Sequence, residues 1–172
     1  MENFRSPIGM VAYIKITVIA VGKLKEKYLK EGINEYVKRL SRFCDIEIQE
    51  VGDEQAPENL SPAQEKQIKG KEAERIVKKI KDNSLLIALD VKGQKLDSEG
   101  FAEKLQSFFI SGHSHITFLI GGSLGLDHEL LKRAHMRFSM SDLTFPHQLA
   151  RLILMEQLFR AFKIINGETY HK

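Results

Sequence analysis

The residues with the clearest chemical potential are the glycines of segment 121–125, which reads Gly-Gly-Ser-Leu-Gly. The segment follows the apolar run 116–120 and precedes the polar, helix-like segment 127–133. A strand that ends in glycines brings bare backbone close to a ligand, because glycine has no side chain to hold the ligand away. The spacing matches neither the G-x-G-x-x-G fingerprint nor the Gly-Lys-Ser/Thr phosphate loop, and dinucleotide-binding domains carry such a turn after their first strand rather than this late in the chain. The pattern is equally typical of an ordinary tight connection between a strand and a helix.

A second candidate is segment 140–147, which reads Met-Ser-Asp-Leu-Thr-Phe-Pro-His. It follows a predicted strand and forms a loop at that strand's carboxyl end, where open α/β sheets bind their ligands. Residues 89–93 and 121–125 occupy the same place after two other strands. If the three strands are neighbours, the three loops line one pocket, whose apolar walls would suit an adenine ring. The alternative is a plain connection whose Ser, Asp and Thr cap the next helix.

The chain ends in Tyr170, His171 and Lys172, which offer a stacking ring, a titratable base and a cation. Together these groups could hold a nucleobase. C-terminal residues are more often frayed, and the sequence alone favours a frayed tail.

The remaining candidates are basic or titratable side chains with weaker patterns. Segment 64–81 reads as a helix with seven Lys or Arg against three Glu, which is usually a solvated face but could also contact phosphates. His113, His115, His128 and His135 lack a third ligand at an informative spacing. We interpret them as solvated histidines and predict no metal site.

Composition bounds the class of protein. The chain has 172 residues, a formal net charge of +3 and a pI near 8.9, which permits a nucleic-acid partner without requiring one. The sequence carries one cysteine, Cys44, so an intrachain disulfide is impossible. No apolar run approaches the roughly 20 residues of a membrane helix, and the N-terminus lacks a secretory pattern. We therefore expect a cytoplasmic protein with no membrane association.

The elements that must position these loops alternate along the chain. Segments 14–21, 46–51, 85–89, 116–120 and 137–140 read as strands, and helical stripes separate them. Gly93 is expected to follow the third strand, and Ser98 to cap the next helix. This alternation predicts an α/β fold with a mostly parallel sheet and helices on both faces. We expect one domain over residues 14–172, preceded by an N-terminal extension, residues 1–13.

The last helix, to about residue 165, carries two apolar stripes rather than one. A surface helix needs a single stripe. Burial on two sides indicates either a core on one side and a partner subunit on the other, or a helix wholly internal to one chain.

Several segments together resemble the ribosomal RNA large subunit methyltransferase H family. The similarity runs from Ile14 to the last residue, with the N-terminal extension as the clear departure. The segments that carry it are 14–25, 53–61, 120–125, 144–148, 159–162 and 170–172.

This resemblance implies a SPOUT-class fold whose C-terminal part forms a trefoil knot, an exception to the rule that chains do not thread loops. It implies a homodimer that transfers a methyl group from S-adenosylmethionine to N3 of a pseudouridine in 23S rRNA, on assembled ribosomes and without a metal. The family's cofactor positions correspond to Leu89, Gly121, Met140, Ser141, Asp142, Leu143, Thr144 and Phe145. Its catalytic tail, thought to complete the site across the dimer, corresponds to Arg160, Tyr170 and His171.

A mechanism follows from these roles. N3 of pseudouridine must lose its proton before it attacks the methyl group, and His171 could take that proton, or Tyr170 and His171 could orient the base. Arg160 could stabilise the developing negative charge or hold a phosphate. Two other functions fit parts of the sequence: a non-catalytic module that binds RNA or the ribosome, and a methyltransferase for small molecules.

Overall fold

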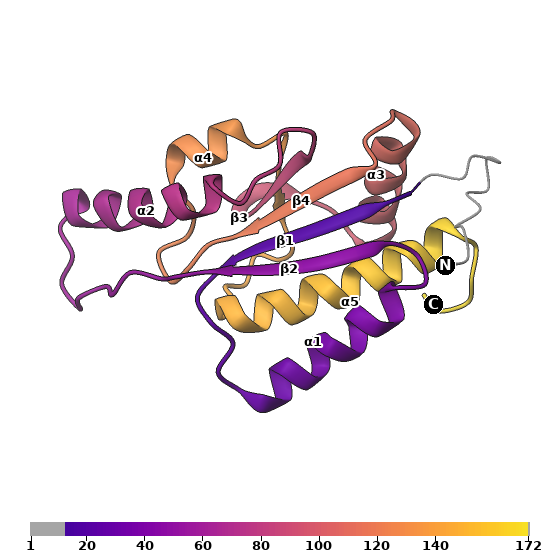
Figure 1. The fold of residues 1–172 in the computed structure, drawn as a ribbon, viewed down its shortest axis with the longest axis horizontal. Coiled ribbons are helices and arrows are strands. Elements are labelled where there is room, and N and C mark those ends of the chain that lie inside the picture. Colours follow the sequence, from indigo (N-terminus) through magenta and orange to yellow (C-terminus); the bar gives the residue numbers. More distant parts are fainter. Residues whose placement is uncertain (1–12, 172) are drawn as a thin grey trace.

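The computed structural model describes residues 13–171, in which strands and helices alternate as the sequence predicts (Figure 1). The strands are β1 (Lys15–Val21), β2 (Asp45–Val51), β3 (Leu85–Lys95), β4 (His115–Ile120) and β5 (Met136–Ser139). The helices are α1 (Lys27–Leu40), α2 (Pro62–Val77), α3 (Ser98–Ile110), α4 (His128–Arg133) and α5 (His147–Ile165). The predicted extension lies outside the described residues except for Tyr13, whose hydroxyl donates to Asp45. Within residues 13–171, no helix is both long enough and apolar enough to cross a bilayer.

The five strands form one sheet in the order β2-β1-β4-β3-β5, and every pair is parallel. The predicted parallel α/β sheet is therefore confirmed. Because all strands point the same way, their carboxyl ends meet at one edge of the sheet. The trefoil knot that the resemblance implies stays a prediction.

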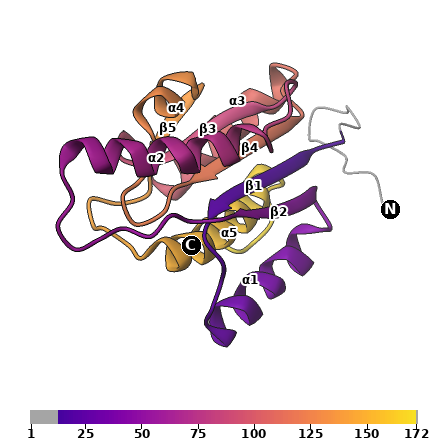
Figure 2. The same cartoon turned by 60° about the vertical axis from the view of Figure 1, so that its left-hand side comes forward.

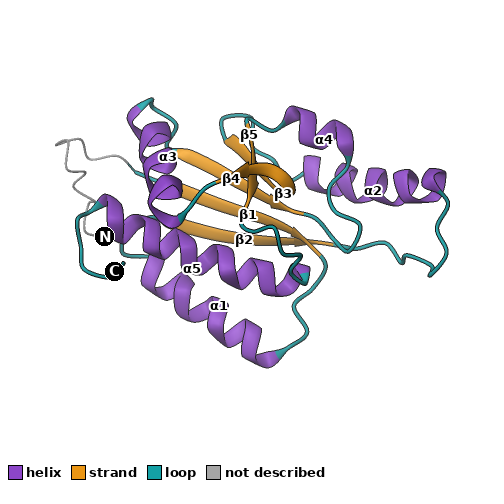
Figure 3. Cartoon of the chain, turned by 180° about the vertical axis from the view of Figure 1, so that it is seen from behind, coloured by secondary structure: helices purple, strands orange, loops and turns teal. Residues whose placement is uncertain are grey.

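Helices cover both faces of the sheet, as expected. Helices α1, α3 and α5 share the larger apolar core on one face (Figure 3), whereas α2 and α4 share a smaller core on the other (Figure 2). The alternation along β1 shows how one strand serves both cores. Ile16, Val18 and Ala20 face the first core, and Ile19 and Val21 face the second.

Two helix starts are set by capping side chains. Ser61 caps α2 in a reciprocal capping box with Gln64, and this moves the helix start two residues ahead of the predicted one. Asp97, not Ser98, caps α3, because its carboxylate accepts from the backbone N–H of Gly100 at 2.7 Å. The expected cap at Ser98 was therefore wrong by one residue.

Strand β3 is longer than predicted, because Gly93 lies inside it. Leu89 and Gln94 both pair with Phe138 of β5, so the residues between them bulge away from the ladder. A Cβ on Gly93 would lie 2.6 Å from the backbone carbon of Arg137. The glycine is needed for a close approach of two backbones rather than for ending the strand.

Helix α5 lies between α1 and α3, and none of its residues is exposed in the single chain. Phe162 stacks on Phe43 and Phe109 with ring centroids 5.6 and 5.9 Å apart. Leu152 packs against Gly32 of α1, where a Cβ would meet its methyl group at 3.1 Å. Packing within one chain thus accounts for much of the two-stripe pattern, and the partner subunit stays a prediction.

Candidate functional site

A cavity of about 840 Å³ lies at the carboxyl ends of β3, β4 and β5. These three strands are neighbours in the sheet, so the predicted convergence of their loops is confirmed. Of the eight predicted cofactor positions, seven line this cavity: Leu89, Gly121, Met140, Ser141, Leu143, Thr144 and Phe145. Asp142 is not among the lining residues, because its side chain is 77% exposed and forms an ion pair with Lys95.

The glycine segment forms a tight turn in the cavity wall. The backbone N–H of Gly125 donates to the carbonyl of Gly122 at 3.0 Å, and Gly125 has φ +82°. A Cβ on Gly121 would lie 2.6 Å from the backbone carbon of Gly125, so no other residue fits there. Helix α4 begins after this turn, with Asp127 as its cap. The turn therefore presents backbone to the cavity, and the capping carboxylate occupies the helix start where a phosphate would otherwise bind.

The opposite wall of the cavity is the loop after β5. The Ser141 hydroxyl accepts from the backbone N–H of Leu143 at 3.0 Å, and the carbonyl of Ser141 accepts from the Ser139 hydroxyl. This local bonding fixes the loop while it leaves the Leu143 side chain 69% exposed at the cavity. Val91, in the bulge of β3, also lines the cavity and is 54% exposed. Two exposed aliphatic side chains, Val91 and Leu143, therefore lie at this cavity.

Charged side chains around the cavity are few and mostly paired. Arg137 donates to the carboxylate of Asp90 through Nε at 2.8 Å, and Lys69 of α2 pairs with Glu65. His147, at the start of α5, has a pKa lowered by burial and by the positive charge of Arg151. Neither the four histidines set aside in the sequence nor any other described group brings three potential metal ligands together.

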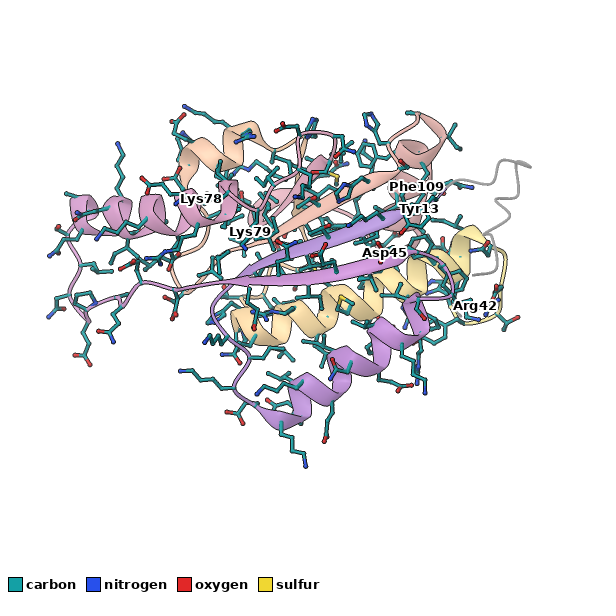
Figure 4. The ribbon with its side chains drawn as sticks, viewed as in Figure 1. Tyr13, Arg42, Asp45, Lys78, Lys79 and Phe109 are labelled. Carbon is teal, nitrogen blue, oxygen red and sulfur yellow. The ribbon has the colours of Figure 1, made fainter. Side chains whose placement is uncertain are left out.

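The C-terminal tail is folded onto α5, so the favoured expectation of a frayed tail was wrong for its described residues. The Tyr170 ring packs edge-on against Phe159 with centroids 5.0 Å apart, and the Arg160 guanidinium lies 4.8 Å from the Tyr170 centroid. Glu168 anchors the same segment through Lys163, at 2.6 Å, and through Arg42 in the turn after α1. Figure 4 labels Arg42. The tail is therefore held at a defined position.

Arg160, Tyr170 and His171 are brought together, as predicted. Arg160 Nη1 lies 3.1 Å from His171 Nδ1. An arginine can only donate, so His171 accepts through Nδ1 and the neutral ring carries its proton on Nε2. Nε2 lies 3.6 Å from the carboxylate of Glu99. For His171 to act as a base at Nδ1, Arg160 must first release that nitrogen.

The tail cluster and the cavity lie at opposite ends of one subunit. His147 begins α5 beside the cavity, and Arg160 lies thirteen residues further along the same helix. At 1.5 Å per residue this places the two about 20 Å apart along the helix axis. In Figure 1 the C-terminus lies near the end of α5 that is remote from the strands' carboxyl ends. The cofactor positions and catalytic positions that the resemblance implies do not meet within one chain.

Sequence reasoning missed one buried polar side chain, Arg151, and misjudged another, His115. Arg151 is fully buried in α5, where it donates to Glu50 at 2.6 Å and to the Gly22 carbonyl at 3.2 Å. An arginine within an apolar stripe is the signal that could have found it. His115, predicted to be solvated, is 8% exposed and bonded to the Thr17 hydroxyl at 2.9 Å. The expectation for His115 was wrong because this residue begins β4 rather than preceding it.

Comparisons with known proteins agree with this geometry. Residues 14–171 match the family described as "Predicted SPOUT methyltransferase". The chain is 66% identical over 159 residues to the ribosomal RNA large subunit methyltransferase H of Acetivibrio thermocellus, covering 92% of this chain and all of that protein. It is 62% identical, with the same coverage, to the protein of that name from Ruminiclostridium cellulolyticum.

A solved structure, that of a probable methylase family protein from Haemophilus influenzae Rd KW20, matches with a TM-score of 0.50. The match has 17% sequence identity and covers 95% of this chain and 72% of that one, so it speaks for the fold alone. With near full-length similarity in sequence and a cavity at the expected strand ends, the chain belongs to the SPOUT methyltransferases, in the ribosomal RNA large subunit methyltransferase H family.

Proposed function

We propose that this protein transfers a methyl group from S-adenosylmethionine to N3 of a pseudouridine in 23S rRNA, on assembled ribosomes in the cytoplasm. The observation that carries the proposal is that seven of the eight cofactor positions expected from the family line one and the same cavity. The relatives' name, which specifies large subunit ribosomal RNA, supports the substrate.

The residues around the cavity fit S-adenosylmethionine. The cavity volume lies within the roughly 300–1,000 Å³ range of small-molecule sites. Leu89, Met140 and Phe145 supply apolar walls for an adenine ring, and the Gly121 turn lets a ligand lie against bare backbone. When bound, this cofactor supplies an electrophilic methyl group on a sulfonium, and its sulfur leaves as a neutral thioether.

A composite site in a homodimer would bring the cavity of one subunit and the tail cluster of the other together. The tail cluster lies about 20 Å along α5 from the cavity of its own chain, too far to touch a substrate bound there. In a dimer with two-fold symmetry, each tail can complete the cavity of the other subunit. The exposed Leu143 and Val91 at the cavity are surfaces that such an arrangement would cover.

The tail residues then act on the nucleobase. His171 accepts the N3 proton, or it orients the base together with Tyr170, while the N3 lone pair forms the new bond to carbon. Arg160 stabilises the negative charge that develops on the base, or holds a neighbouring phosphate. Because Arg160 donates to His171 Nδ1 in the free subunit, substrate entry must redirect that donor toward the base. Alignment of the attacking nitrogen with the methyl group is the main contribution of the protein.

The test is mass mapping of 23S rRNA from cells with and without the gene. The proposal predicts one pseudouridine that is methylated at N3 only when the gene is present. Purified protein should restore that methyl group on ribosomes that lack it, and His171→Ala should abolish or strongly slow the transfer. Full transfer by His171→Ala would refute the base assignment.

The rival functions give different results in the same system. A non-catalytic module for RNA or the ribosome should release no heat with S-adenosylmethionine in calorimetry, whereas the proposed enzyme should bind it. A methyltransferase for small molecules should bind the cofactor and leave ribosomes unmodified.

A further inference from the structure

Glu156 on α5 lies at the centre of the tail cluster. Its Oε1 atom accepts from Arg160 Nε at 3.1 Å, from Arg160 Nη2 at 2.6 Å and from the Tyr170 hydroxyl at 3.2 Å. Its Oε2 atom accepts from Gln157 at 2.7 Å. One carboxylate thus bonds both to a helix residue one turn away and to a tail residue fourteen positions later.

These bonds fix the direction of the whole Arg160 side chain. With Nε and Nη2 held by Glu156, the remaining donor, Nη1, points at His171, and the guanidinium lies over the Tyr170 ring. Both partners are largely shielded, with side-chain exposures of 20% for Glu156 and 24% for Arg160. Removing the carboxylate would free Arg160 and Tyr170 together.

A similar pair on α1 shows what the tail cluster adds. Glu35 and Arg39 have the same spacing, and Arg39 lies over the rings of Tyr36 and Phe159, the second of which packs against Tyr170. The Glu35 side chain is 51% exposed, and no described bond joins it to the tail. A surface pair of this kind contributes little to order. Glu35 is therefore a matched control for Glu156.

We propose that Glu156 is a positioning residue for methyl transfer: it holds Arg160 and Tyr170 in the orientation in which the tail meets the partner's cavity. The proposal rests on the proposed function, because it assumes that the tail acts on the substrate. It adds a division of labour, in which Tyr170 keeps its proton and donates it in a hydrogen bond to Glu156, so only His171 is left to accept a proton from the base.

The electrostatics of the cluster agree with this division. Burial, and next the negative charge of Glu156, raise the pKa of Tyr170 to about 12, so its phenol keeps its proton at neutral pH. The hydrogen bond to Glu156 raises the pKa of Arg160 above its usual value. Replacing Glu156 with glutamine keeps the shape and removes the charge, so the pKa of Tyr170 should fall toward the usual value near 10.

The experiment compares Glu156→Gln, Tyr170→Phe and the double variant with Glu35→Gln in the intact protein. Three quantities are measured: methyl transfer to ribosomes, calorimetric affinity for S-adenosylmethionine, and tyrosinate absorbance between pH 8 and 13, with Tyr170→Phe identifying the Tyr170 signal. We expect Glu156→Gln to lower kcat about tenfold or more with unchanged cofactor affinity, and to shift the Tyr170 titration to lower pH. The double variant should be no slower than the slower single variant, and Glu35→Gln should match the wild type.

Three results would overturn the proposal: a wild-type kcat in Glu156→Gln, an unmoved Tyr170 titration, or independent, multiplying losses in the double variant. If the wild type transfers no methyl group to ribosomes, the proposed function fails instead. The titration and the cofactor affinity still report then whether Glu156 holds Tyr170, so the two failures are distinguishable. If Glu156→Gln does not fold, Glu156→Asp replaces it. Its shorter carboxylate should slow transfer without weakening cofactor binding, and a wild-type rate would overturn the proposal.

Discussion

Gly121 is the residue at which backbone geometry and the candidate site coincide. Its missing side chain leaves room for the backbone of Gly125, which would otherwise lie 2.6 Å from a Cβ atom. No flexible side chain stands at this contact, so a neighbouring backbone would have to move. The turn that lines the cavity therefore requires a residue without a Cβ atom at position 121.

Gly121→Ala should destabilise the protein by about 1–3 kcal/mol, the usual cost of inserting a methyl group into packed surroundings. It should also weaken binding of S-adenosylmethionine, because the turn must shift at the cavity wall. Urea unfolding and calorimetry measure the two effects.

The matched control is Gly70→Ala in α2, where a Cβ would meet no atom within 4 Å. That change should stabilise the protein by up to about 1 kcal/mol, because alanine favours a helix. Equal stability of the two alanine variants would contradict the steric account of Gly121.

For single residues, the sequence predicted the positions of the cavity residues better than those of the tail residues. Leu89 ends an apolar run and Gly121 follows one, and the strand direction fixes where each run ends, so both positions could be placed. The packed tail could not be placed, because the contacts of Tyr170 with Phe159 and Glu156 form only after α5 has folded. Chemical type alone could not distinguish Asp142, which pairs with Lys95 away from the cavity.

At the scale of elements, a buried arginine ties α5 to two strands. Arg151 donates to Glu50 near the end of β2 and to the carbonyl of Gly22 after β1. Burial alone would raise the pKa of Glu50. The hydrogen bonds from Arg151 and from the backbone of Leu24 outweigh this effect, so the pKa lies below the usual value. Glu50 thus stabilises the fold as an anion at the end of the sheet where the cavity lies.

Glu50→Gln should destabilise the protein by about 2 kcal/mol at pH 7, since it removes the charged partner of a buried guanidinium. A lowered carboxyl pKa contributes stability above the unfolded pKa near 4.3, and that contribution is lost as the pH falls through the folded pKa. The difference between wild type and variant should therefore shrink below about pH 4. Urea unfolding across this pH range measures it.

Glu129→Gln supplies the control, because Glu129 forms an exposed pair with Lys132 and its side chain is 77% exposed. Its effect should stay below about 0.5 kcal/mol. If Glu50→Gln lowers the free energy of unfolding no more than this control, the ion pair between Arg151 and Glu50 does not stabilise the contact between α5 and the strands.

The elements themselves followed closely from the sequence. Apolar runs, helical stripes and capping residues located the strands and helices of the described chain, because burial imposes a period of two or 3.6 residues. The errors arose where tertiary contacts decide. Strand β3 continues past Gly93 because β5 lies against it, and His115 is buried because it enters the ladder beside Thr17.

At the scale of the whole molecule, the two regions that we propose to form the active site lie at opposite ends of the chain. The cavity lies at the carboxyl edge of the sheet, and the tail cluster lies at the far end of α5. A composite site requires a second copy of the chain in the opposite orientation, so that the tail of each copy lies at the cavity of the other. Sequence periodicity could not establish that arrangement, because α5 is largely buried by α1 and α3 in its own chain.

The most direct test co-expresses two defective subunits with different tags and purifies the dimers that carry both. One subunit carries Gly121→Ala in the cavity, and the other ends at Gly167 and lacks the tail. Each hybrid dimer then has one site with an intact cavity and an intact tail and one site with both defects.

If the site is composite, each variant alone is nearly inactive on ribosomes, and hybrid dimers recover about half of the wild-type rate per dimer. Hybrid dimers no more active than their parents would contradict the composite site and place cavity and tail function within one chain.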